Sequence, residues 1–124
     1  MKFYQCAHCG NIVVYAENHG VPVMCCGQKM QEIVPGSMDA SAEKHVPAVE
    51  TAGNLVTVKV GAAAHPMIEA HHIAWIVLET AQGFQKKDLN PTGDPQAIFA
   101  LADGDAPVAA YAYCNLHGLW MKEI

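Results

Sequence analysis

The sequence lacks the features that mark nucleic-acid-binding and membrane proteins. It has no long basic run, and seven Lys and Arg against twelve Asp and Glu give a net charge of −5. The sequence therefore offers no basic patch that could bind a phosphate backbone, and we expect no nucleic-acid partner. The apolar stretch 73–78 is too short to cross a bilayer, and residues 1–6 form no apolar signal segment. These absences predict a cytoplasmic protein without a membrane partner.

A sustained helical period with caps, internal repeats and low-complexity segments are also missing. Apolar residues make up 52% of the chain, which is enough for a genuine core. Strands are predicted at 55–60, 73–78, 97–101 and 108–114, with a strong turn signal at 103–107. Several short strands between turns indicate an all-β fold, an antiparallel sandwich.

Composition divides the chain into two domains, 1–36 and 37–124, at a Pro35-Gly36 turn or linker. The first domain has predicted strands at 3–6, 11–15 and 23–26. So small a module cannot hold itself together by apolar burial, so it needs a metal or a partner surface.

Four of the five cysteines lie in this first domain. Cys6 and Cys9 form a C-x-x-C-G knuckle, and the adjacent pair Cys25 and Cys26 follows fifteen residues later. In a compartment where thiols stay reduced, this pattern predicts a tetrahedral site of four thiolates. The adjacent pair cannot form a second knuckle and should distort the tetrahedron. Four thiolates suit iron and zinc equally, and structural zinc or simple burial of some cysteines remain alternatives.

Five histidines follow residue 40, placed around predicted turns, and the fifth cysteine ends a late strand: His45, His65, His71, His72, His117 and Cys114. A single histidine is more often a core or surface residue than a ligand. Several together with a thiolate suit a borderline transition metal. More than four donors indicate an iron with one open position, which catalysis requires.

The ordered motifs resemble those of desulfoferrodoxins along essentially the whole chain. They are Cys6-x2-Cys9-x15-Cys25-Cys26, Glu43-Lys44-His45-Val46-Pro47, His65-Pro66-Met67-x3-His71-x3-Trp75-Ile76 and Cys114-Asn115-x-His117-Gly118-Leu119-Trp120. The resemblance implies a desulforedoxin-like, rubredoxin-like four-cysteine module followed by a neelaredoxin-like domain with an immunoglobulin-like β-sandwich.

The resemblance also implies two iron ions per chain. The first would be bound by Cys6, Cys9, Cys25 and Cys26, and the second by His45, His65, His71 and His117 with Cys114 as axial thiolate. The implied enzyme is a superoxide reductase, which reduces superoxide to hydrogen peroxide and detoxifies reactive oxygen in an anaerobe or microaerophile. Lys44 would attract the anion, and Glu43 would occupy the open position at rest. Without the motif, both would be expected to form a solvated charge pair.

Family membership further implies a homodimer and a rubredoxin or similar electron donor. The position after His71 is usually Tyr in relatives, but it is His72 here. The spacing from His65 selects His71 as ligand and leaves His72 outside the ligand set. Two alternatives to the reductase are a pure electron-transfer protein with an inert second site and a superoxide dismutase, which thiolate ligation disfavours.

Overall fold

The computed structural model describes residues 1–124 and divides into two compact units, Met1–Val34 and Pro35–Ile124. The division lies two residues before the predicted boundary at residue 36. No helix is long and apolar enough to cross a membrane.

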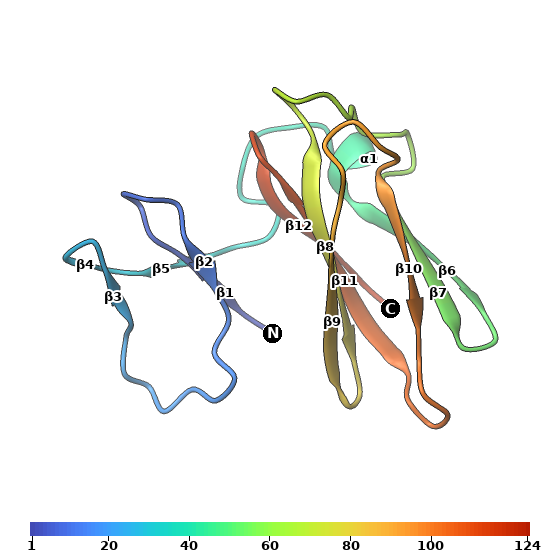
Figure 1. Ribbon diagram of the computed structural model, residues 1–124, viewed down its shortest axis with the longest axis horizontal. Helices are drawn as coiled ribbons and strands as arrows, with labels where there is room; N and C mark the ends of the chain where they lie inside the picture. Colours follow the sequence, from blue (N-terminus) through green and yellow to red (C-terminus); the bar gives the residue numbers. More distant parts are fainter. The chain divides into compact units, whose positions relative to one another are not determined.

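The first unit consists of five very short strands: β1 (Phe3–Gln5), β2 (Ile12–Val13), β3 (Met24–Cys25), β4 (Gln28–Lys29) and β5 (Gln31–Ile33). An antiparallel sheet has the order β2-β1-β5, while β3 and β4 form a separate hairpin (Figure 1). Only Phe3, Cys6 and Met30 are buried in this unit. Its apolar core is therefore too small to explain its fold without a further source of stability.

The second unit is a β-sandwich with a single helical turn, so the predicted all-β class is confirmed. Its elements are α1 (Ala42–His45), β6 (Pro47–Ala52), β7 (Leu55–Val60), β8 (Ile73–Thr80), β9 (Gly83–Asp88), β10 (Gln96–Ala100), β11 (Pro107–Cys114) and β12 (Gly118–Glu123). One antiparallel sheet has the order β10-β7-β6 and the other β12-β11-β8-β9 (Figure 1).

Alternating side chains build the core between the two sheets. Val56, Val58 and Val60 are buried on β7, whereas Lys59 between them is exposed. Phe99 on β10 is fully buried and belongs to the same cluster, which is completed by residues of β8 and β11. A period of two thus assigns each side chain to the core or to the outside.

Three strands of this sandwich escaped sequence analysis, and all three lie at sheet edges. They are β6, β9 and β12, whereas the predicted strands at 55–60, 73–78, 97–101 and 108–114 correspond to β7, β8, β10 and β11. Every residue of β9 except Gln85 is exposed, so it shows no buried stripe. An edge strand pairs on one side only and carries a weaker hydrophobic pattern.

Register places three connections at one end of the sandwich. Pro47 pairs with Val60, so α1 and the segment after β7 emerge together. Cys114 pairs with both Ile73 and Gly118, so the segment before β8 meets the β11–β12 turn. These three connections carry all five predicted ligands of the second metal.

Gly61 allows α1 to approach the end of β7 closely. A Cβ atom at this buried position would lie 2.5 Å from the Glu43 carbonyl oxygen and 2.9 Å from the Lys44 carbonyl carbon. Both neighbours are backbone atoms, so no side-chain rotation could relieve the overlap. The absence of a side chain at this position therefore allows α1 to lie directly against the end of β7.

Two candidate metal centres

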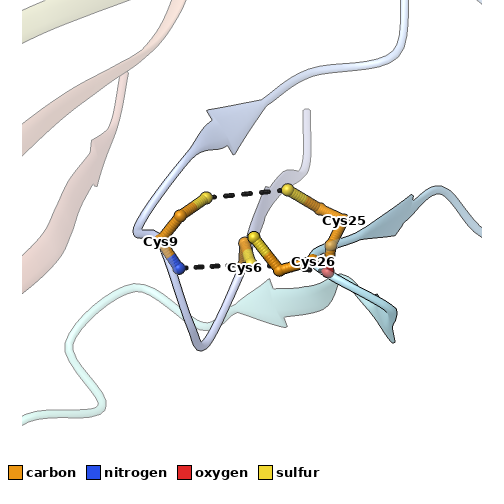
Figure 2. Close-up of side chains that lie close together, drawn as sticks. All are labelled: Cys6, Cys9, Cys25 and Cys26. Carbon is orange, nitrogen blue, oxygen red and sulfur yellow. Dashed lines mark hydrogen bonds between the residues drawn. The ribbon is translucent and has the colours of Figure 1, made fainter.

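The four cysteines of the first unit point their sulfur atoms toward one another (Figure 2). All four Sγ atoms lie within 4.8 Å of each other, and those of Cys9 and Cys25 are 3.6 Å apart. In the knuckle, the Cys9 amide donates to the Cys6 Sγ at 3.4 Å and the Gly10 amide donates to the Cys6 carbonyl at 3.0 Å. Gly10 has φ 82°, the left-handed conformation that this turn requires.

The turn between β3 and β4 explains how adjacent cysteines reach one point. Cys25 pairs with Gln28, which leaves a two-residue loop of Cys26 and Gly27 with φ of 54° and 71°. Two consecutive positive φ values are typical of a type I′ hairpin turn. On an extended strand, neighbouring side chains point to opposite faces, but the left-handed Cys26 departs from that pattern. The positive φ of Cys26 is the feature that sequence analysis missed.

The thiols of this cluster differ in acidity. The hydrogen bond from the Cys9 amide lowers the pKa of Cys6 to about 6. Hydrogen bonding with the Cys9 side chain raises the pKa of Cys25, and the same contact is the largest cause that raises the pKa of Cys26 to about 12. Cys25 and Cys26 keep their protons mainly because these protons are shared in hydrogen bonds within the cluster, and burial and the neighbouring negative charge add to the effect. A bound cation offsets that negative charge and deprotonates its ligands outright, so the donor set fits a metal.

Four imidazoles at the end of the sandwich surround one point. Ring centroids of consecutive pairs lie 4.6 Å (His45–His65), 4.7 Å (His65–His71), 5.1 Å (His71–His117) and 5.0 Å (His117–His45) apart. Each pair is edge-on, at 76° to 88°, and the diagonal His45–His71 is 6.5 Å. The four rings therefore form a square.

Hydrogen bonds fix which nitrogens face the centre of the square. The Nδ1 atom of His45 donates to the Ser41 carbonyl at 2.6 Å, and that of His65 to the Pro66 carbonyl at 2.7 Å. In the neutral rings both Nε2 atoms are then acceptors, yet they lie 3.1 Å apart. The Nε2 atom of His71 is buried without any partner. Lone pairs that face one another in this way fit a shared metal ion.

Burial lowers the pKa of His45, His65 and His71 and so favours the neutral imidazole that a metal ligand must be. It lowers the pKa of His65 to about 4 and is also the largest cause of the lowered pKa of His45 and His71. Neighbouring imidazoles lower these pKa values further, because a second positive charge in the square would be repelled.

Cys114 approaches the square from the hydrophobic core, where it is fully buried. Its Sγ atom and the Nε2 or Nδ1 donors of His45, His65 and His71 all lie within 4.8 Å of one another. His117 is outside this tightest group, although its Nδ1 atom lies 3.9 Å from the Cys114 Sγ. The Trp120 ring lies tilted by 31° against the His45 ring, with the centroids 5.0 Å apart, and its Nε1–H donates to the His117 carbonyl at 3.0 Å.

The remaining predicted residues lie outside the square. Glu43 and Lys44 are exposed on α1, and the Lys44 charge contributes, after burial and other groups, to the lowered pKa of His45 and His71. Lys44 therefore lies within electrostatic range of the centre. The His72 ring is directed at the carbonyls of Ile68 and Glu69 instead of the square.

Comparisons with known proteins show the family of the chain. The desulfoferrodoxin family profile matches residues 37–123. A desulfoferrodoxin from Nitratidesulfovibrio vulgaris is 44% identical over 98% of this chain and 95% of its own length. The superoxide reductase structure from Treponema pallidum has 38% identity and a TM-score of 0.83, covering 98% of both chains. The superoxide reductase (1Fe-SOR) from Giardia intestinalis has 33% identity and a TM-score of 0.56, covering 66% of this chain and 97% of its own. The chain belongs to the desulfoferrodoxin family.

Proposed function

We propose that this desulfoferrodoxin-family chain is a superoxide reductase that converts superoxide to hydrogen peroxide. The observation that carries the proposal is the square of four imidazoles with a buried cysteine on its core side. Five donors exceed what a tetrahedral structural metal uses and leave one position of an octahedral ion for substrate. Relatives named superoxide reductase, among them the Treponema pallidum protein, support the same activity.

Iron is the metal that the family implies at both centres. The first iron would be held by Cys6, Cys9, Cys25 and Cys26, and the second by His45, His65, His71, His117 and Cys114. When bound, the second iron supplies the electron that superoxide accepts, and a thiolate ligand increases the electron density available for that step.

The chain's own residues prepare the substrate. The exposed Lys44 ammonium attracts the superoxide anion toward the square, where no other lysine contributes to the lowered pKa of the imidazoles. Its Nζ protons also order the water from which the product takes its protons. Glu43, one residue earlier on the same exposed turn, is the carboxylate available to cover the open position between turnovers.

The proposal extends to organisation and surroundings. Residues 1–36 would be a desulforedoxin-like module and residues 37–124 a neelaredoxin-like domain. A homodimer would supply a partner surface to a module with only three buried residues. Five cysteines without a disulfide suit a reducing compartment such as the cytoplasm, and a rubredoxin or similar carrier would return the electron.

The test compares the wild type with Cys114→Ser in superoxide consumption and iron content. We expect two irons per wild-type chain, hydrogen peroxide formation without dioxygen, and at least a ~100-fold slower reaction in Cys114→Ser. The absorption of the four-cysteine centre should be unchanged in this variant and serves as its control. Unchanged turnover would contradict the role of Cys114, and dioxygen release at half the rate of superoxide consumption would indicate dismutation instead.

A further inference from the structure

The segment that carries His71 is a small loop closed on itself. The Ile68 amide donates to the His71 carbonyl and the His71 amide donates to the Ile68 carbonyl, both at 3.0 Å. Glu69 and Ala70 form the exposed tip between them. The backbone of His71 is thus fixed to Ile68, but these two bonds alone leave the whole loop free to pivot.

The His72 ring closes this loop further. Its Nδ1 atom lies 3.1 Å from the Ile68 carbonyl oxygen and 3.0 Å from the Glu69 carbonyl oxygen. Carbonyl oxygens only accept, so Nδ1 carries a proton and donates to both. The His72 ring therefore holds the tip of the loop close to the backbone of His72, which directly follows the ligand His71.

Asn115 ties the same loop to the turn that carries the other ligands. Its Oδ1 atom accepts from the His72 amide at 2.9 Å, and its Nδ2 atom donates to the Ala70 carbonyl at 3.1 Å. Its own amide donates to the His72 carbonyl at 3.2 Å. Asn115 directly follows Cys114, so one residue connects two ligand-bearing segments that are 43 positions apart.

His71 needs such support more than His45 and His65 do. His45 and His65 are each oriented by an Nδ1–H donated to a backbone carbonyl, whereas no hydrogen bond orients the His71 ring. A ligand imidazole is ordinarily oriented by its second nitrogen, and loss of that support typically weakens metal binding 10- to 100-fold. The His71 ring can instead be held only through its backbone and packing.

We propose that His72 and Asn115 form a clamp that positions the His71 imidazole in the iron square. Neither residue touches the metal, so both are positioning residues. The inference rests on the proposed function in taking His71 and Cys114 as iron ligands. It assigns a role to the histidine that stands where relatives usually have tyrosine.

Three substitutions test the clamp in the full-length, iron-loaded protein. His72→Phe keeps a ring but removes the donor, whereas His72→Asn retains an N–H near the position of Nδ1. Asn115→Asp keeps the acceptor for the His72 amide and removes only the donor to the Ala70 carbonyl. The readouts are the rate at which a chelator removes the second iron and the energy of its sulfur-to-iron absorption band.

We expect iron release to be about tenfold faster in His72→Phe, with a shifted band, and two- to fivefold faster in Asn115→Asp. His72→Asn should return the rate to within about twofold of wild type. The absorption of the four-cysteine centre should stay constant throughout, which shows that the chain is folded. Asn90→Ala is the matched control, because Asn90 braces an exposed loop through Thr92 and carries no ligand nearby.

His71→Ala separates failure of the clamp from failure of the proposed function. Loss of the second iron in His71→Ala, with wild-type release in both His72→Phe and Asn115→Asp, would overturn the clamp alone. Retention of both irons in His71→Ala would overturn the ligand assignment and the clamp together. Failure of His72→Asn to rescue, with the band as in His72→Phe, would also contradict the hydrogen-bonding role.

Discussion

The two units reach a metal site by opposite routes. The first has three buried residues and strands of two or three residues, yet four sulfur atoms converge within it. The second has a buried cluster spanning both sheets, and its donors are set in connections at one end of that framework. We infer that a metal stabilises the fold of the first unit, whereas the fold of the second unit positions the metal ligands. Cys9→Ser and Phe99→Ala test that contrast, and Tyr111→Phe and Lys44→Ala test the second unit by itself.

The largest effect is expected from Cys9→Ser. Cys9 is exposed, so the change removes a ligand with little loss of packing. Binding of a structural metal supplies on the order of 10 kcal/mol, which is folding free energy in a module this small. We expect iron content to fall from two to one, with amide protection lost in residues 3–33 and retained in residues 55–123, as measured by hydrogen exchange.

His8→Ala is the control for that experiment, because His8 is exposed inside the same knuckle without being a ligand. It should keep both irons and full protection. Protected amides in an iron-free first unit would show that this unit folds without its metal, which would contradict the proposed difference between the two units.

A smaller effect, confined to the second unit, is expected from Phe99→Ala. Phe99 is fully buried, and truncation of such a ring typically costs 3–5 kcal/mol. The unfolding free energy from denaturant titration should fall by about that much, while the four-cysteine absorption persists. Ile98→Ala, at the adjacent and 48% exposed position, should change stability by less than about 1 kcal/mol. Equal effects at both positions would contradict the assigned core.

Alkaline pH offers a third comparison. Burial, assisted by Glu79, raises the pKa of Tyr111 to about 12, and its hydroxyl lies 3.1 Å from the Glu79 carboxylate. Unfolded tyrosine ionises near pH 10, so the folded state resists a deprotonation that the unfolded chain undergoes. Stability should therefore fall between pH 10 and 12 by up to about 2 kcal/mol. Tyr111→Phe should lack this loss, measured as the difference between parallel denaturant titrations, and equal pH slopes would refute the assignment.

The smallest effect is expected from Lys44→Ala. Removing the cation should slow superoxide encounter about three- to tenfold and weaken its dependence on ionic strength. Stopped-flow or pulse-radiolysis rates at several salt concentrations measure both. Lys59→Ala is the matched control, because Lys59 is exposed on the same unit and pairs with Glu50. Identical salt slopes for both variants would make Lys44 an ordinary surface charge.

The sequence predicted those elements whose residue pattern follows directly from the local backbone geometry. The alternation of Val56, Thr57 and Val58 predicted β7, and the C-x-x-C-G spacing predicted the knuckle at Cys6 and Cys9. Sequence reasoning failed at the edge strands β6, β9 and β12, because β9 is almost wholly exposed and neither β6 nor β12 alternates between buried and exposed positions. The single turn α1 is too short to show a helical period.

The detailed geometry of each metal centre could not be predicted from residue patterns alone. Spacing could not show that Cys26 adopts a left-handed conformation, since that depends on the hairpin it closes. Nor could it show that the Asn115 side chain binds the His72 amide and the Ala70 carbonyl, because these contacts depend on tertiary register. The choice of His71 over His72 came from family spacing, and the ring square is consistent with it.

Gly61 has a consequence for laboratory evolution of this protein. Any side chain there would displace the backbone of Glu43 and Lys44, and with it the start of the segment that holds His45. If the residues around the metal centre were randomised, only glycine would therefore be tolerated at position 61, although this position binds neither metal nor substrate. Conversely, a variant that accommodated alanine at position 61 through a shifted α1 would alter one edge of the imidazole square without changing any donor atom.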